Sequence, residues 1–453
     1  MSKLTLSALG LLLALSTALL SPAGALAAEK TSPPVTVYTH LTLIDGTGAP
    51  AAADMAVVVE GEQIKSVLTM AALAREPLPG ATVVDLAGKF ALPGLIDTHQ
   101  HLGTSPNRRA AEAQLQRLVY GGVTAVRDMA GDGRFLADLA RAARLGEIPA
   151  PDISFSALMA GPGFFNDPRT HAAAQGAEPG RVPWLQAITA GTDMTLAVAE
   201  ARGTGAAGIK IYADLPAAEV NRIVAEAHRQ GFPVWAHACI FPTSPADGVA
   251  AGIDSVSHAY MLAYQLNPTD TLSYHTKPAI DLAKLNADTT VLPAIFADMI
   301  RRGTILDATV HTFFESDLHK KPEAAARGPV CAQVAAAAYH AGVAISAGTD
   351  FVPKADDPYP GLQTEMETLV RDVGMTPADV IRAATSVAAR ALKADARMGT
   401  LVPGKLANLV IVARNPLTDI TALREVVLTV KRGHAYPRAD YRQPDAKILD
   451  EDF

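Results

Sequence analysis

The stretch Ala91-Leu92-Pro93-Gly94-Leu95-Ile96-Asp97-Thr98-His99-Gln100-His101 decides how this chain is interpreted. It places two histidines two residues apart at the end of an apolar segment that has the composition of a β-strand. Side chains at i and i+2 of a strand point to one face, about 6 to 7 Å apart. Neutral imidazole is the commonest side-chain metal ligand, so His99 and His101 can share one divalent ion. Two polar residues that merely close a strand would give the same sequence pattern. Whether His99 and His101 bind a metal therefore depends on further candidate ligands elsewhere in the chain.

Seven more apolar segments of strand length follow this stretch, and helix-patterned segments separate several of them. The clearest helices are predicted over residues 216–229 and 324–340, each followed by a glycine as a stop signal. Strands that alternate with helices indicate βαβ units and a parallel sheet. With the strand that leads into His99 there are eight, which favours a closed (β/α)8 TIM-type barrel over an open sheet. The seven strands are predicted at 123–127, 153–157, 208–212, 234–238, 255–258, 304–308 and 343–348.

The two ends of the chain have a different sequence pattern. There, short segments with the alternating pattern of β-strands are separated by turns. At 453 residues the chain also exceeds the ~250 to 300 residues at which a single core usually stops growing. We therefore predict a small β-sandwich domain built from residues 29–88 and 399–440, and a hydrolase barrel over residues 89–398.

Residues 1–27 have the composition of a secretory signal peptide. Lys3 is followed by an apolar run over residues 9–20 and by small residues at Ala25-Leu26-Ala27. The run is shorter than the ~20 residues of a spanning helix, so an uncleaved anchor is the weaker alternative. The sequence predicts export to the periplasm or outside the cell, without stable membrane insertion after cleavage. Export permits disulfides, but Cys239 and Cys331 are far apart in sequence and are expected to be free.

The formal net charge of -7 and the lack of a long basic run argue against nucleic acid and anionic membranes as partners. The expected partner is a small-molecule substrate, and the sequence does not indicate an oligomeric state. The glycines over residues 203–208 match a dinucleotide-binding pattern, but they follow a helix-like segment and precede a strand, so we interpret them as a loop. The G-x-S-x-G elbow of serine hydrolases does not occur.

Ionisable residues stand at the C-terminal ends of the predicted strands, where the active site of a barrel lies. Burial of polar groups without partners costs a few kcal/mol each, so packing alone explains such a gathering poorly. The sequence therefore predicts a metal centre at this rim. Its candidate ligands are His99, His101, Lys210, His237, His258 and Asp350.

These motifs resemble the amidohydrolase superfamily, and within it the imidazolonepropionase-like branch that includes prolidase-type dipeptidases. The resemblance extends over nearly all of the chain after the signal peptide. The motifs that carry it lie at residues 92–101, 208–212, 235–238, 256–259, 347–350 and 399–410.

The resemblance implies a binuclear centre. In that arrangement His99, His101 and Asp350 hold one divalent ion and His237 and His258 hold a second, while Lys210, carboxylated by CO2, bridges them. A carbamate offers two anionic oxygens, whereas an ammonium has no lone pair for a metal. A salt-bridging lysine beside a single ion is the alternative. Nitrogen and oxygen ligands suit Zn²⁺ best, but they also admit Mn²⁺, Co²⁺ or Fe²⁺.

Such a centre implies hydrolysis of amide C–N bonds, most plausibly in dipeptides or N-acyl amino acids. Bound metal lowers the pKa of water toward about 7, and Asp350 would carry the proton of that water to the leaving amine. Tyr212 can donate to the developing oxyanion or merely cap the barrel mouth. His171, in the loop over residues 161–181, can bind a substrate carboxylate or simply be solvated.

Two other functions stay open at this point. The same centre can hydrolyse a cyclic amide or a lactone, and a positive group near His171 would argue for a substrate carboxylate instead. A non-catalytic binding protein of this fold would be expected to have lost ligands, whereas this chain retains the full predicted set.

Overall fold

The computed structural model describes residues 33–76, 78–268, 271, 273–318, 327–445 and 447–448. The predicted signal peptide and the first residues of the helix predicted over 324–340 lie outside this part of the chain. Within it, no helix is both long and apolar enough to cross a bilayer.

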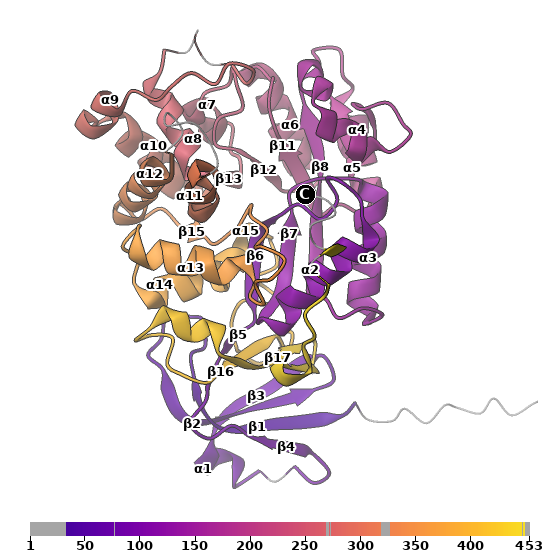
Figure 1. Ribbon diagram of the computed structural model, residues 1–453, viewed down its shortest axis with the longest axis vertical. Helices are drawn as coiled ribbons and strands as arrows, with labels where there is room; N and C mark the ends of the chain where they lie inside the picture. The colour runs from indigo at the N-terminus through magenta and orange to yellow at the C-terminus, as the bar shows by residue number, and fades with distance from the viewer. Residues whose placement is uncertain are drawn as a thin grey trace, which may run out of the picture. The chain divides into compact units, whose positions relative to one another are not determined.

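Eight parallel strands form the predicted (β/α)8 barrel, which the structure confirms (Figure 1). Each barrel strand pairs with the next barrel strand, including the third and the fourth, which an excursion separates in the sequence. The strands are β6 (Leu95–Gln100), β7 (Val123–Asp128), β8 (Asp152–Ala160), β11 (Gly208–Ile211), β12 (Val234–His237), β13 (Ser255–Ser257), β14 (Ile305–Asp307) and β15 (Ile345–Ser346).

The barrel closes where the segment after β15 meets β6. The backbone amide of Thr98 donates to the carbonyl of Ala347 at 3.1 Å, and the amide of Asp350 donates to the carbonyl of His99 at 2.9 Å. Gly348 permits this approach, since a Cβ there would lie 2.1 Å from a carboxylate oxygen of Asp307 and 2.8 Å from the Cβ of His99. We call this junction the seam.

Helices surround the barrel and turn their apolar faces toward it. In α6 (Ala217–Arg229), for example, Val220, Ile223, Val224 and Ala227 are buried at helical spacing, as the prediction over 216–229 requires. The glycines over residues 203–208 run from the last residue of α5 to the first residue of β11, so this segment connects a helix to a strand, as interpreted. The other principal helices are α2 (Arg108–Tyr120), α3 (Gly133–Leu145), α5 (Met194–Gly203), α7 (Pro245–Ala250), α8 (Ala259–Leu262), α9 (Leu282–Ala287), α10 (Val291–Arg302), α11 (Val310–Leu318), α12 (Arg327–Ala341), α13 (Gly361–Arg371), α14 (Pro377–Ala383) and α15 (Ser386–Ala391).

An excursion between β8 and α5 builds one wall above the barrel. It contains a short 3-10 helix, η1 (Pro162–Asn166), then α4 (Pro168–Ala174) and the strands β9 (Arg181–Val182) and β10 (Leu185–Ala187). Strand β10 pairs with the end of β8, so this segment is fixed beside the rim of the barrel.

A second sheet combines both ends of the described chain, as predicted, in the order β18-β17-β16-β5-β1-β2-β3 with β4 beside β1. Strand β5 belongs to this sheet and β6 to the barrel, so the chain passes between them at Gly94, where a Cβ would lie 2.3 Å from the side chain of Thr124. The strands are β1 (Val35–Leu43), β2 (Ala52–Glu60), β3 (Gln63–Thr69), β4 (Thr82–Asp85), β5 (Phe90–Pro93), β16 (Leu409–Val412), β17 (Val426–Lys431) and β18 (His434–Pro437).

Candidate metal centre

The six predicted ligands all lie at the C-terminal rim of the barrel. His99 and His101 come from the end of β6, and Asp350 follows β15 across the seam. Lys210 lies in β11, His237 ends β12 and His258 directly follows β13. Four of these side chains have at most 5% exposure, namely His99, Lys210, His237 and His258.

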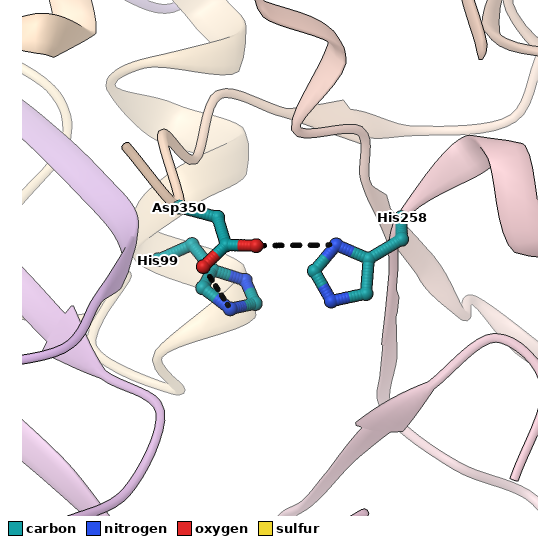
Figure 2. A group of neighbouring side chains, drawn as sticks. All are labelled: His99, His258 and Asp350. Atoms are coloured by element: carbon teal, nitrogen blue, oxygen red, sulfur yellow. Dashed lines mark ion pairs between the residues drawn. The ribbon is translucent and has the colours of Figure 1, made fainter. Parts of the chain in front are cut away.

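The carboxylate of Asp350 lies between the imidazoles of His99 and His258 (Figure 2). Its Oδ1 is 3.7 Å from Nε2 of His99 and 3.3 Å from Nε2 of His101, and its Oδ2 is 3.8 Å from Nδ1 of His258. The ligand atoms of His99, His258 and Asp350 lie within 4.8 Å of one another, close enough to surround one ion at ~2 Å from each atom. These residues therefore form a possible metal site.

His237 and Lys210 extend this group along the rim. The ring centroid of His237 is 4.8 Å from that of His258. Nζ of Lys210 and Nδ1 of His237 are buried and have no hydrogen-bond partner among the described residues. Because an unpaired buried polar atom costs free energy, both atoms fit a site that is completed by a ligand. The division of the six residues between two ions stays a prediction.

Burial shifts three of the candidate ligands, Lys210, His237 and His258, toward the unprotonated state that metal binding needs. Burial lowers the pKa of Lys210 to about 7, so a large share of its amine is neutral near pH 7, the form that reacts with CO2. Burial also lowers the pKa of His258 to about 3 and holds the pKa of His237 well below its ordinary value. Both imidazoles are therefore neutral at physiological pH.

Asp307, at the end of β14, supports His99 and is absent from the sequence-based ligand set. Its carboxylate is fully buried, and Nδ1 of His99 lies 2.7 Å from it. It also accepts from Thr98 Oγ1 at 2.8 Å, Ser257 Oγ at 3.0 Å and a guanidinium nitrogen of Arg127 at 3.2 Å. Burial raises the pKa of Asp307, but His99 and Arg127 outweigh it and hold the pKa at about 2. An ionised Asp307 keeps the proton on Nδ1 and leaves Nε2 of His99 for a metal.

We expect Asp307→Asn to weaken metal binding by ~10- to 100-fold, the usual effect of removing a carboxylate that orients a ligating histidine. Titration with metal buffers measures this affinity, and thermal melting checks the fold. Asp254→Asn is the matched control, because Asp254 also pairs with a histidine, His228 at 2.9 Å, but precedes β13 at the other end of the barrel. Equal metal affinity of Asp307→Asn and the unmodified protein would contradict the assignment.

Asp97 ties the two sides of the seam together. It accepts hydrogen bonds from the backbone amides of His99 and Thr349, each at 3.0 Å, and from the side-chain amide of Gln100 at 2.7 Å. Asp350, which follows Thr349 in the chain, has a φ of +47°, a conformation that non-glycine residues rarely adopt. The surrounding hydrogen bonds therefore hold Asp350 in a strained backbone conformation that aims its carboxylate at the histidines.

A cavity of about 430 Å³ opens over the centre and is lined by His101, His237, His258 and Asp350. This volume lies in the range of small-molecule sites, ~300 to 1,000 Å³. Tyr212 also lines the cavity, and burial raises the pKa of its hydroxyl, which therefore keeps its proton as a hydrogen-bond donor.

The structure places Arg169, and not His171, in the wall of the cavity. His171 is exposed on α4 and lies outside the cavity lining. Arg169 makes a bidentate ion pair with Asp167 through Nε and Nη2, and Nη2 also lies 3.4 Å from the hydroxyl of Tyr212. The guanidinium of Arg169, two residues before His171 in the chain, is therefore a positive group in this part of the cavity wall.

Comparison with solved structures finds the same fold in several proteins. A Xaa-Pro dipeptidase with bound methionine in its active site has a TM-score of 0.70 and 24% identity, over 89% of this chain and 100% of that one. A putative prolidase from Bifidobacterium longum has a TM-score of 0.67 and 25% identity, over 93% and 99%. The A. niger ochratoxinase has a TM-score of 0.70 and 23% identity, over 90% and 96%. No curated protein matches the sequence.

The sequence itself matches the Amidohydrolase family over residues 90–435. This match begins at the first residue of β5 and extends through the whole barrel into the last strands of the second sheet. Because it spans most of the chain, including every candidate ligand, this protein belongs to the amidohydrolase family.

Proposed function

We propose that this amidohydrolase is an exported, binuclear metal-dependent enzyme that hydrolyses the amide bonds of dipeptides or N-acyl amino acids. The observation that carries the proposal is the buried amine of Lys210, which has no hydrogen-bond partner among the described residues and stands at the rim that the candidate histidines share. A carbamate on this amine would supply two anionic oxygens between the two groups of ligands. Export rests on the composition of residues 1–27.

When bound, the metal ions would supply a Lewis acid for the substrate carbonyl and a water molecule of lowered pKa. Side chains of the protein would carry out the remaining steps, which are proton transfer and stabilisation of the oxyanion. Asp350 lies within 4 Å of three imidazoles, so its carboxylate can take a proton at the centre and deliver it to the leaving amine. Tyr212 presents a protonated hydroxyl in the same cavity, where it can donate to a developing oxyanion.

Arg169 favours a substrate with a free carboxylate over a cyclic amide or a lactone. Asp167 occupies Nε and Nη2 of its guanidinium, and among the described residues Nη1 donates no hydrogen bond. Guanidinium groups bind carboxylates through charge-assisted hydrogen bonds. A carboxylate next to the scissile amide is what dipeptides and N-acyl amino acids share.

The direct test is a substrate screen of the full-length, exported protein after treatment with zinc and bicarbonate. We expect about two zinc ions per chain, release of free amino acids from dipeptides or N-acyl amino acids, and an N-terminus that begins close to residue 28 by mass spectrometry. Fewer than about one metal ion per chain, or turnover of cyclic amides and lactones alone, would overturn the proposal.

We expect Arg169→Gln to raise KM for a dipeptide by ~10- to 100-fold with a smaller effect on kcat, because it removes a hydrogen bond to a charged group. The same variant should leave turnover of the carboxyl-amidated dipeptide unchanged. Arg181→Gln is the matched control, because Arg181 lies in the same excursion but pairs with Glu178 outside the cavity. An equal rise in KM for the free and the amidated substrate would rule out carboxylate binding by Arg169.

A further inference from the structure

One wall of the cavity is apolar and lies beside Arg169. Its side chains come from the residue after β7, from β8, and from the excursion with η1, α4 and β10. Four of them belong to one buried hydrophobic cluster, in which each is at most 5% exposed. We call this wall the apolar recess. Its members are Met129, Leu158, Phe164, Ala173 and Leu185.

Two polar side chains next to the apolar recess, those of Thr170 and Gln100, already donate hydrogen bonds within the protein. The hydroxyl of Thr170 donates to the carbonyls of Phe165 at 3.1 Å and Asp167 at 2.7 Å. The side-chain amide of Gln100 donates to Asp97 and to Thr349, each at 2.7 Å. A polar or charged group that packed against the apolar side chains of the recess would therefore lose its water without gaining a donor from Thr170 or Gln100, which costs a few kcal/mol.

The apolar recess and the guanidinium belong to one short segment. Arg169, Thr170 and Ala173 occupy positions i, i+1 and i+4 of α4, so they share one face of the helix, and that face lines the cavity. Phe164 lies in η1 immediately before this helix. A ligand held by Arg169 therefore has apolar side chains directly beside its carboxylate.

From this arrangement we infer that the enzyme selects substrates whose carboxyl-terminal residue has a large apolar side chain, which packs against Leu158, Phe164 and Ala173. In an amino acid the carboxylate and the side chain share one Cα, so a carboxylate at Arg169 brings its own side chain, and not the acyl half, to the apolar recess. The inference rests on the proposed hydrolysis of dipeptides or N-acyl amino acids.

Four dipeptides test the preference in the zinc-loaded enzyme. We expect kcat/KM for glycyl-L-phenylalanine to exceed that for glycyl-L-alanine by ~10- to 100-fold, because the larger side chain fills an apolar pocket. Glycyl-L-aspartate should be poorer still. L-phenylalanyl-glycine, which has the same composition with the order reversed, should resemble glycyl-L-alanine. Equal rates for the two orders, or a preference for L-phenylalanyl-glycine, would overturn the inference.

A variant with a larger side chain in the apolar recess tests whether the recess residues determine the preference. Ala173→Phe should reduce kcat/KM for glycyl-L-phenylalanine by ~10-fold or more and that for glycyl-L-alanine by much less, so that the ratio of the two falls. Ala172→Phe is the control, because Ala172 lies on the same helix but outside the cavity lining. Calorimetric binding of L-phenylalanine and L-alanine, the expected products, provides a second readout, and Ala173→Phe should weaken only the first.

Leu185→Ala is a second variant of the apolar recess, to be used if Ala173→Phe does not fold. This variant enlarges the apolar recess and should lower binding of L-phenylalanine while binding of L-alanine stays the same. An unchanged ratio between the two substrates in a folded, metal-loaded variant would overturn the assignment of the recess. If the unmodified enzyme hydrolyses none of the dipeptides or N-acyl amino acids, the proposed function fails first, and the two failures are thereby distinguished.

Discussion

Lys210→Ala is expected to abolish binding of the second metal ion and to reduce kcat/KM on the order of 10³-fold, because several kcal/mol of charge stabilisation are lost with that ion. Alanine leaves a space in the rim where the amine now lies buried and unpaired. Metal analysis of the purified variant, with steady-state kinetics on a dipeptide, measures both effects.

Two comparisons make this experiment specific for the carbamate. Short carboxylic acids such as acetate should restore part of the activity of Lys210→Ala, since a carboxylate supplies the two oxygens that the carbamate would offer. Lys431→Ala is the control for loss of a buried lysine, because Lys431 is 3% exposed and pairs with Asp152 at 3.1 Å, away from the cavity. Retention of two metal ions by Lys210→Ala would refute a bridging role.

Asp350→Asn should lower kcat by ~10²- to 10⁴-fold, the range for removal of a general acid–base group. Asparagine keeps the size of the side chain and tolerates the left-handed backbone of this position, so the change tests charge and proton transfer and not folding. Presteady-state and steady-state rates at matched metal content give the effect.

Asp214→Asn is the matched control for Asp350. Asp214 also follows a barrel strand and has a φ of +59°, but its carboxylate pairs with His275 at 3.0 Å outside the cavity lining. This variant should keep kcat within about twofold of the unmodified enzyme, as expected for a change outside the cavity. A comparable loss in both variants would show that any rim aspartate supports the reaction only through the fold.

The barrel was predictable because its strands are short apolar runs with helical patterns between them. Period and composition are local properties, so β7, β11 and β12 can be recognised without knowledge of their neighbours. The gathering of the candidate ligands was predictable for the same reason, since the barrel brings the C-terminal ends of all its strands to one rim.

Asp307 and Arg169 were missed because their roles depend on tertiary contacts. Asp307 falls inside the strand predicted over residues 304–308, and only the approach of His99 and Arg127 shows that its carboxylate contacts the candidate centre. The sequence signal was present, since Asp307 ends its strand as His237 ends β12. On α4, residues two apart diverge by about 200° around the helix axis, so a cavity that faces Arg169 leaves His171 outside.

Because candidate ligands lie on both sides of the seam, bound ions would also affect the stability of the closed barrel. Asp97 and Thr349, which join across it, lie 252 residues apart in the chain, so closure of the barrel there carries the entropy cost of a very long loop. Ions held jointly by His99 and Asp350 would cross-link the two ends of the barrel much as a disulfide cross-links a loop. Metal supply would then affect the lifetime of the folded enzyme against proteases as well as its chemistry, because loss of the ions would remove this cross-link between the first and last strands.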